Sequence, residues 1–398
     1  MYFIPYIGTI LLTLINFADI LRQKEVICMD FVEQAGVPKQ RLRLSAYAWS
    51  IIEQDRMNFS HDGEALSKAG LLNRIFLNFY EHAEASIPLR VEEKVIEWND
   101  IVKSSDNDNY DALIEKLCNG YQAELQLKIK HLCKPGDSEL AWNLTLQVDV
   151  CKLLIGLWNR NFFSIEPGAK ITRGKFLIAV FEEYAKKPYV EREQIYFERI
   201  FIDIEDAILH ERPIIITYAQ TDKPLHVLPH SLETDKLSMY NYLIGFARPA
   251  TSHYSTAVDD NLTIESFRLS KIQRVEIDRY QKAGSGKLSP EQCARIKKSR
   301  AKHGTMFIAD EDQIYEIVVK LTDEGKLKYI NQVHMRPSQC INSKHNSREN
   351  SDIYVFNCTI HQAKAYFFKF GSDAEILSPF LLREQFQKEY LKAAAIYE

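Results

Sequence analysis

Five short apolar segments follow a helical segment in residues 198–280, and this series limits the fold more than any other feature of the chain. The helix is expected over Glu198–Glu211, because Ile200, Ile204 and Ile208 fall on one face. Polar or Pro-containing turns separate the segments that follow. Short strands joined by turns predict a small, strongly bent β-barrel. The strands are expected at Ile214–Tyr218, Leu225–His230, Met239–Ile244, Ser266–Ile272 and Val275–Ile277.

A second pattern lies near the N-terminus, where basic and apolar residues alternate over residues 39–44. Alternation with period two predicts a strand with one buried face. Leu42 and Leu44 would point to the core, and Lys39, Arg41 and Arg43 would point outward. Helices are expected after this strand at 45–54, capped by Ser45, and at 67–85.

This order of strand, helix, turn and helix resembles the ribbon-helix-helix family. In that family two chains pair their strands into a ribbon that enters the major groove of DNA. The resemblance implies a homodimer and contacts between duplex DNA and Lys39, Arg41 and Arg43. A plain surface strand with solvated charges is the alternative interpretation. Residues 96–197 contain amphipathic helical stretches at Ala112–Leu132, Leu140–Trp158 and Gly174–Lys186, which predict a helical linker.

The strand series resembles the WYL domain of bacterial regulators, a small SH3- or Sm-like barrel. The Trp-Tyr-Leu triplet of that family stands here as Asn241-Tyr242-Leu243, so the Trp is absent. Pro229-His230 precedes the triplet, and Phe267-Arg268-Leu269 is followed by Lys271-Ile272.

The WYL resemblance implies that the barrel binds a regulatory ligand, with single-stranded nucleic acid or a nucleotide as the fitting class. Arginine forms bidentate contacts with phosphate, and Tyr and His offer stacking faces to unpaired bases. A structural role in the core is the alternative for each tyrosine, and an ion pair with an acid is the alternative for the arginine. The matching residues are Tyr218, His230, Tyr240, Tyr242 and Arg268, with Lys271 and Arg274 nearby.

A basic helix is expected at residues 289–304, with Ser289 as N-cap, Pro290 in the first turn and Gly304 past the end. Its five basic residues form either a solvated face or a footprint for a phosphate backbone. Strands at 314–321 and 352–360 and helices at 323–332, 362–370 and 379–397 follow. The segment Phe370–Pro379, with Leu382-Arg383, resembles the extension that follows WYL barrels, which implies a ferredoxin-like module.

The sequence carries no enzyme motif: HExxH, GxSxG and a complete phosphate-binding loop are all missing. We therefore expect a non-enzymatic protein without a metal or cofactor. The formal net charge of -4 means that nucleic-acid binding must depend on local basic patches. The seven cysteines are scattered without a CxxC pair, as in a cytoplasmic protein with reduced thiols.

Residues 2–18 carry no charge. The run lacks the basic residues of a signal peptide and is short for a membrane span, because Asp19 and Arg22 end it. Lys24–Ile27 can be encoded by a bacterial ribosome-binding sequence placed just before Met29. We interpret residues 1–28 as an apolar leader upstream of a native start at Met29. A single membrane anchor is the alternative.

The expected fold class is α+β and multidomain. The expected function is that of a dimeric, non-enzymatic, nucleic-acid-binding WYL regulator whose barrel binds single-stranded RNA or DNA. It would act either in transcription or on an RNA-guided effector nuclease. The second role is implied by a resemblance to WYL accessory proteins of type VI-D CRISPR systems, which lies in the domain layout and in the segments Phe176–Arg192 and Met239–Leu243. The alternative is a DNA-binding transcription factor whose barrel senses a small nucleotide. The expected boundaries are 1–28 (leader), 29–95 (ribbon-helix-helix), 96–197 (helical linker), 198–280 (WYL domain) and 281–398 (basic helix and C-terminal extension).

Overall fold

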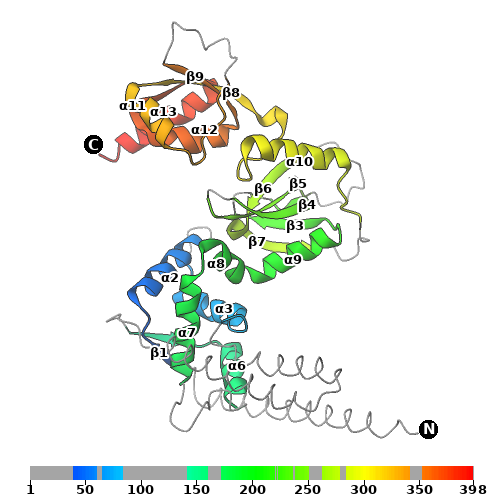
Figure 1. Cartoon of the computed structure of the whole chain (residues 1–398), viewed down its shortest axis with the longest axis vertical. Coiled ribbons are helices and arrows are strands. Elements are labelled where there is room, and N and C mark those ends of the chain that lie inside the picture. Colours follow the sequence, from blue (N-terminus) through cyan, green and yellow to red (C-terminus); the bar gives the residue numbers. More distant parts are fainter. Residues whose placement is uncertain are drawn as a thin grey trace, which may run out of the picture. The chain divides into compact units, whose positions relative to one another are not determined.

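The structure is a computed structural model, and it describes residues 39–60, 65–83, 141–159, 172–219, 221, 223–235, 238–250, 262–277, 284–340 and 352–397. The chain divides into two compact units, Met1–Tyr196 and Phe197–Glu398. The described part mixes helices with three small antiparallel sheets (Figure 1). The predicted leader at 1–28 and the predicted helix at 112–132 lie outside the described residues.

The first unit begins with strand β1 (Lys39–Leu42) and two helices, α2 (Ala46–Asn58) and α3 (Lys68–Phe79). The predicted alternation is confirmed, because Leu42 and Leu44 are fully buried while the three basic residues between and before them are exposed. Ser45 caps α2, as predicted, and its hydroxyl accepts a hydrogen bond from the backbone N–H of Ala48 at 3.1 Å. Helix α3 ends earlier than predicted, at Phe79.

Strand β1 pairs within its own chain. Its antiparallel partner is β2 (Trp142–Thr145), with Lys39 opposite Thr145 and Leu42 opposite Trp142. The prediction of one helix over 140–158 was wrong at its start, because α6 begins only at Val148 (Val148–Asn159). The Trp142 ring instead packs edge-on against Trp49 of α2, with 6.2 Å between ring centroids. The backbone N–H and C=O groups along one edge of β1 are therefore hydrogen-bonded within the chain, so this edge does not need a strand from a second chain.

Helices α7 (Arg173–Lys186) and α8 (Tyr189–Tyr196) complete the first unit. Helix α7 packs against both α2 and α3 with nine buried residues, so the predicted helix at 174–186 is confirmed and lies in the core of this unit. Fully buried Asp55 of α2 accepts a bidentate pair of hydrogen bonds from Arg192 of α8, at 2.7 and 3.1 Å. The hydroxyl of Tyr184 donates to the same carboxylate at 2.9 Å. This buried network joins α2, α7 and α8.

The second unit begins with α9 (Glu198–Leu209), which packs on strands β4 and β7 of a five-stranded antiparallel sheet (Figure 1). The strand order in the sheet is β6-β5-β4-β3-β7, so β7, the last strand in the chain, pairs with β3, the first. A 3₁₀ turn at Leu269–Lys271 connects β6 to β7. The strands are β3 (Ile214–Tyr218), β4 (Leu225–Thr234), β5 (Asn241–Pro249), β6 (Thr263–Arg268) and β7 (Ile272–Ile277).

All five predicted strands exist; the bounds of β3 are as predicted, and those of the other four differ. Strand β4 continues past Pro229, because the pairing with β5 shifts register between Pro229 and Ser231 and a bulge tolerates proline. Strand β5 starts two residues later than predicted, since Met239 has a φ of 57° and belongs to the turn. Residues 269–271 form the 3₁₀ turn rather than part of a strand.

Helix α10 (Pro290–His303) covers one face of this sheet. Its predicted caps are confirmed: the Ser289 hydroxyl accepts from Gln292 N–H at 3.1 Å, and Gly304 follows with a φ of 79°. Ile296 of α10 is fully buried against Ile244 and Phe246 of β5 and Ile264 of β6. The sheet is thus covered by α9 and α10, and strand β5 is buried along almost its whole length.

The C-terminal part has a three-stranded sheet in the order β10-β8-β9. Its elements are β8 (Tyr315–Leu321), α11 (Asp323–Asn331), β9 (Ile353–Cys358), α12 (Ile360–Phe367), β10 (Ala374–Ser378) and α13 (Phe380–Ala394). Gln339 forms an isolated bridge with Phe356 on the outer edge of β9. The element order is therefore strand, helix, bridge, strand, helix, strand.

Two features of this part were not predicted. Helix α12 starts at Ile360 because the Thr359 hydroxyl accepts a hydrogen bond from Gln362 N–H at 3.0 Å. The α-helix ends at Phe367, three residues before the predicted end, where a 3₁₀ segment (Phe368–Asp373) begins; strand β10, which was not predicted, follows. Four described cysteines are free thiols, of which Cys151 and Cys358 are buried. Among the described residues no helix is long and apolar enough to cross a membrane.

Candidate nucleic-acid interface

The guanidinium of Arg268 lies over the ring of Tyr240, with 3.4 Å between the guanidinium carbon and the ring centroid. Arg268 is the last residue of β6, and Tyr240 precedes β5 by one residue. A cation over a tyrosine face is attracted by the ring, and the stack holds the planar guanidinium in one orientation. Both side chains are half-buried, so part of each surface meets solvent.

Two further predicted tyrosines adjoin this stack. Tyr242 lies directly opposite Arg268 in the β5–β6 register and is 4% exposed. The Tyr218 hydroxyl accepts a hydrogen bond from the backbone N–H of Arg268 at 3.4 Å, and its ring packs edge-on against Phe267. Burial raises the pKa of Tyr218, and it raises the pKa of Tyr242 to about 12. Both phenols are therefore neutral at physiological pH. We call Tyr218, Tyr240, Tyr242 and Arg268 the Arg268 cluster.

His230 belongs to a second group of residues on β4. Its Nδ1 is 2.9 Å from the hydroxyl of Ser231, which donates a hydrogen bond to Glu233 at 3.0 Å. The same Glu233 oxygen accepts from the guanidinium of Arg300 on α10. Burial lowers the pKa of His230, Arg300 and Lys297 lower it further, and Glu233 acts in the opposite direction. His230 is thus a neutral imidazole, and the charges of Arg300 and Lys297 help to keep it neutral.

The structure does not bring Arg274 into the Arg268 cluster. Arg274 lies on β7, is 72% exposed and pairs with Glu276 at 3.1 Å. Lys271 is half-buried in the 3₁₀ turn, where its backbone carbonyl accepts from Ala219 N–H at 3.0 Å. Of the seven predicted barrel residues, four form the Arg268 cluster and His230 joins the group around Glu233. The other two, Lys271 and Arg274, follow β6 in the chain and belong to neither group.

The predicted ribbon residues lie in the first unit. Lys39, Arg41 and Arg43 are all exposed on and just after β1, while the leucines between them are buried. Their shared outward direction gives the strand one basic face. This face is the second place in the described residues where phosphate could bind.

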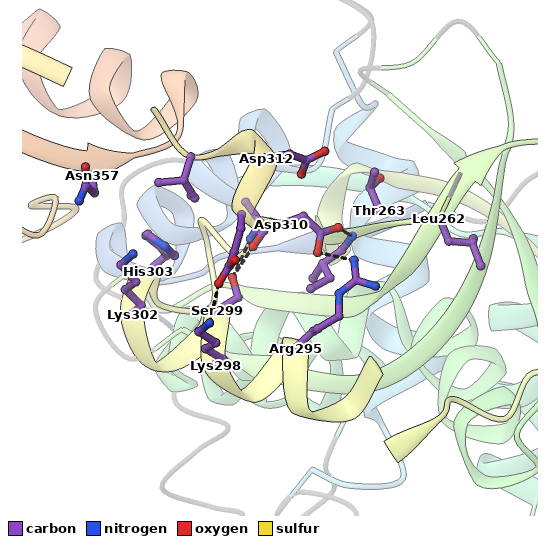
Figure 2. Close-up of a pocket in the computed structure, with 14 residues that line it drawn as sticks. Leu262, Thr263, Arg295, Lys298, Ser299, Lys302, His303, Asp310, Asp312 and Asn357 are labelled. Carbon is purple, nitrogen blue, oxygen red and sulfur yellow. Dashed lines mark hydrogen bonds and ion pairs between the residues drawn. The ribbon is translucent and has the colours of Figure 1, made fainter. Parts of the chain in front are cut away.

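A groove of about 720 Å³ lies along another face of α10, between the helix, β6 and the segment that follows the helix (Figure 2). Its basic side chains face acidic ones: Arg295 pairs with Asp310 at 2.6 Å, and Lys298 pairs with Glu311 at 2.5 Å. Asp310 also accepts from the backbone N–H of Ile264 on β6 at 2.9 Å. The acidic partners neutralise these two cations in the free protein.

Sequence reasoning identified α10 as basic but did not single out Arg300, and it missed Ser231 and Glu233. Arg300 and Glu233 are 67 residues apart in the chain, so no local pattern relates them. Among the described residues, no group of three or more His, Cys, Asp or Glu side chains could hold a metal ion.

Comparisons with known proteins give a likeness in fold. No family model and no curated protein matches the sequence. The structure matches the crystal structure of a CRISPR Cas-related protein, with a TM-score of 0.61 and 22% identity over 90% of this chain and 94% of that one. The two chains therefore share a fold over nearly their whole length. Proteasome accessory factor B/C (PafBC) of Arthrobacter aurescens aligns with a TM-score of 0.25 and 13% identity, over 88% of this chain and 48% of that one.

Proposed function

We propose that this chain is a non-enzymatic regulator of the WYL type that binds single-stranded RNA at the Arg268 cluster. The observation that carries the proposal is the guanidinium of Arg268, held flat on Tyr240 and bordered by two neutral tyrosines. A positioned guanidinium can bind a phosphate through two hydrogen bonds. The half-buried rings of Tyr218 and Tyr240 leave aromatic surface on which an unpaired base can stack, whereas Tyr242 is a core residue. Duplex bases are already stacked and paired, so this chemistry favours single strands.

The proposed setting is a CRISPR system, in which the protein acts as an accessory of an RNA-guided RNA-cleaving nuclease. The likeness in fold to a CRISPR Cas-related protein over 90% of the chain supports this setting. Sequence segments around Phe176–Arg192 and Met239–Leu243 resemble WYL accessory proteins of type VI-D systems, which adds an independent line of support.

The domain types proposed here are supported by strand order. A WYL barrel is supported by the five-stranded sheet whose last strand returns to the first through a 3₁₀ turn. A ferredoxin-like C-terminal module is supported by its strand, helix, bridge, strand, helix, strand order. We further propose that the protein is a cytoplasmic homodimer.

Transcriptional regulation is the second candidate function, and the basic face of β1 favours it. Lys39, Arg41 and Arg43 all point away from the core, as a strand that contacts a DNA backbone requires. In this case the barrel would sense a nucleotide, and the first unit would contact duplex DNA.

Fluorescence anisotropy with labelled single-stranded RNA, single-stranded DNA and duplex DNA separates the two functions. We expect the wild-type protein to bind RNA most tightly and to lose that binding as salt rises. Arg268→Ala should weaken RNA binding about tenfold or more, because it removes both the phosphate contact and the stack on Tyr240. Arg274→Ala is the matched control, since it removes an exposed arginine from the same sheet outside the cluster. Duplex binding that only an Arg41→Ala/Arg43→Ala variant weakens would favour transcriptional regulation instead.

A further inference from the structure

The carboxylate of Glu233 lies in the same row of the sheet as Arg268 and gathers two donors on one oxygen. Glu233 accepts hydrogen bonds from the Ser231 hydroxyl and from the Arg300 guanidinium on the same oxygen. Hydroxyl and guanidinium donors that converge on one point are also the donors that proteins use for phosphate. Lys297, one turn before Arg300 on α10, is exposed and lowers the pKa of His230 together with Arg300.

Glu233 lies in the same row of the sheet as the Arg268 cluster. In the β4–β5 register Glu233 is opposite Tyr242, and in the β5–β6 register Tyr242 is opposite Arg268. Two strand spacings therefore separate the backbones of Glu233 and Arg268, which is about 10 Å. Residues in one row of a sheet face the same side, so an RNA strand bound at Arg268 can continue toward Arg300.

Contacts other than the pair between Arg300 and Glu233 also hold α10 on the sheet. Ile296 is fully buried against the sheet, and the Ser299 hydroxyl exchanges hydrogen bonds with the backbone of Ala309 at 2.7 and 2.9 Å. Arg295 is held by Asp310, which also bonds to β6 (Figure 2). Arg300 itself stays 41% exposed, so its guanidinium can turn toward a ligand while the helix remains in place.

We propose that Arg300 is a phosphate-binding residue of the RNA interface and that Glu233 occupies its phosphate site in the free protein. The RNA phosphodiester competes with this carboxylate, so Glu233 lowers the affinity for RNA. This inference rests on the proposed RNA-binding function and extends it to a second element, α10.

Glu233→Gln tests the inference, because it removes the charge and keeps the shape and one acceptor oxygen. We expect it to tighten binding of a fluorescein-labelled oligouridine by roughly fivefold, the size of one ion pair released for the ligand. Arg300→Gln should weaken binding, and the gain from Glu233→Gln should vanish in the double variant. Glu311→Gln is the matched control, since it removes the same charge from an exposed pair on another face of α10. Its effect should stay below twofold.

The outcomes are distinct from those that test the proposed function. If Glu233→Gln weakens binding or changes it no more than Glu311→Gln does, the pair only joins α10 to β4 and the inference is wrong. If the wild-type protein fails to bind oligouridine, the proposed function itself fails and the inference falls with it. Melting temperatures of all variants, measured in parallel, show whether weaker binding reflects unfolding instead.

Discussion

Replacing Asp55 with Asn should destabilise the first unit strongly, because it leaves a buried arginine without its counter-charge. Asp55 is fully buried and the Arg192 side chain is only 6% exposed. Burial would lower the pKa of Arg192, but the hydrogen bonds and charge of Asp55 raise it above its ordinary value, so the guanidinium keeps its proton. Breaking a buried pair by removing one partner costs about 3–5 kcal/mol.

The expected shift in melting temperature follows from the size of the unit. For a domain of this size 1 kcal/mol corresponds to about 2–4 °C, so Asp55→Asn should lower Tm by roughly 6–20 °C. Calorimetry of the full chain measures this, and the transition of the second unit should stay in place because the network lies within Met1–Tyr196. Glu191→Gln is the matched control, since it removes an acidic residue of the same helix, α8, whose solvent-accessible pair with Lys187 is worth about 1 kcal/mol or less. Equal Tm shifts in the two variants would refute the reasoning.

Two glycine substitutions should change stability in opposite directions. A Cβ at Gly325 of α11 would lie 2.1 Å from the backbone oxygen of Asp373, so Gly325→Ala should cost about 1–3 kcal/mol or more in chemical denaturation. Among the described residues no atom lies within 4 Å of a Cβ at Gly156 of α6, so Gly156→Ala should stabilise its helix by about 1 kcal/mol, and a loss of stability would contradict this expectation. His230 should titrate below its ordinary pKa of 6.5 in NMR spectra, because burial and two nearby cations disfavour the charged ring. The pKa of His230 is lower in the folded than in the unfolded chain, so as pH falls below 6.5 the unfolded chain binds a proton that the folded chain does not. The free energy of unfolding should therefore decrease as pH drops from 6.5 toward the folded pKa. Glu233→Gln should lower the His230 midpoint further, and an unchanged midpoint would show that the two side chains are not coupled.

Local chemistry explains what the sequence could predict. The caps of α10 depend on Ser289, Pro290 and Gly304, which act within one turn of the helix, so the sequence alone places both ends correctly. The alternation at residues 39–44 fixes the buried and exposed faces of β1 in the same local way. The four residues of the Arg268 cluster came from the WYL resemblance, and the structure brings them together.

Long-range contacts explain what the sequence could not predict. The partner of β1 is separated from it by about a hundred residues, and its apolar positions also fit a helix, so the prediction merged β2 with α6. The contact between Glu233 and Arg300 depends on how α10 packs on the sheet, and the sequence around either residue does not indicate that the two side chains meet.

The most direct test of the RNA-binding claim is to locate the bound strand by photocrosslinking. Oligoribonucleotides that carry 4-thiouridine would be crosslinked to the full chain and the modified peptides identified by mass spectrometry. The account predicts crosslinks to the peptides that contain Tyr240 and Tyr242, lost in Arg268→Ala. Crosslinks confined to residues 39–43, unchanged in Arg268→Ala, would contradict it and would place nucleic-acid binding on the basic face of β1.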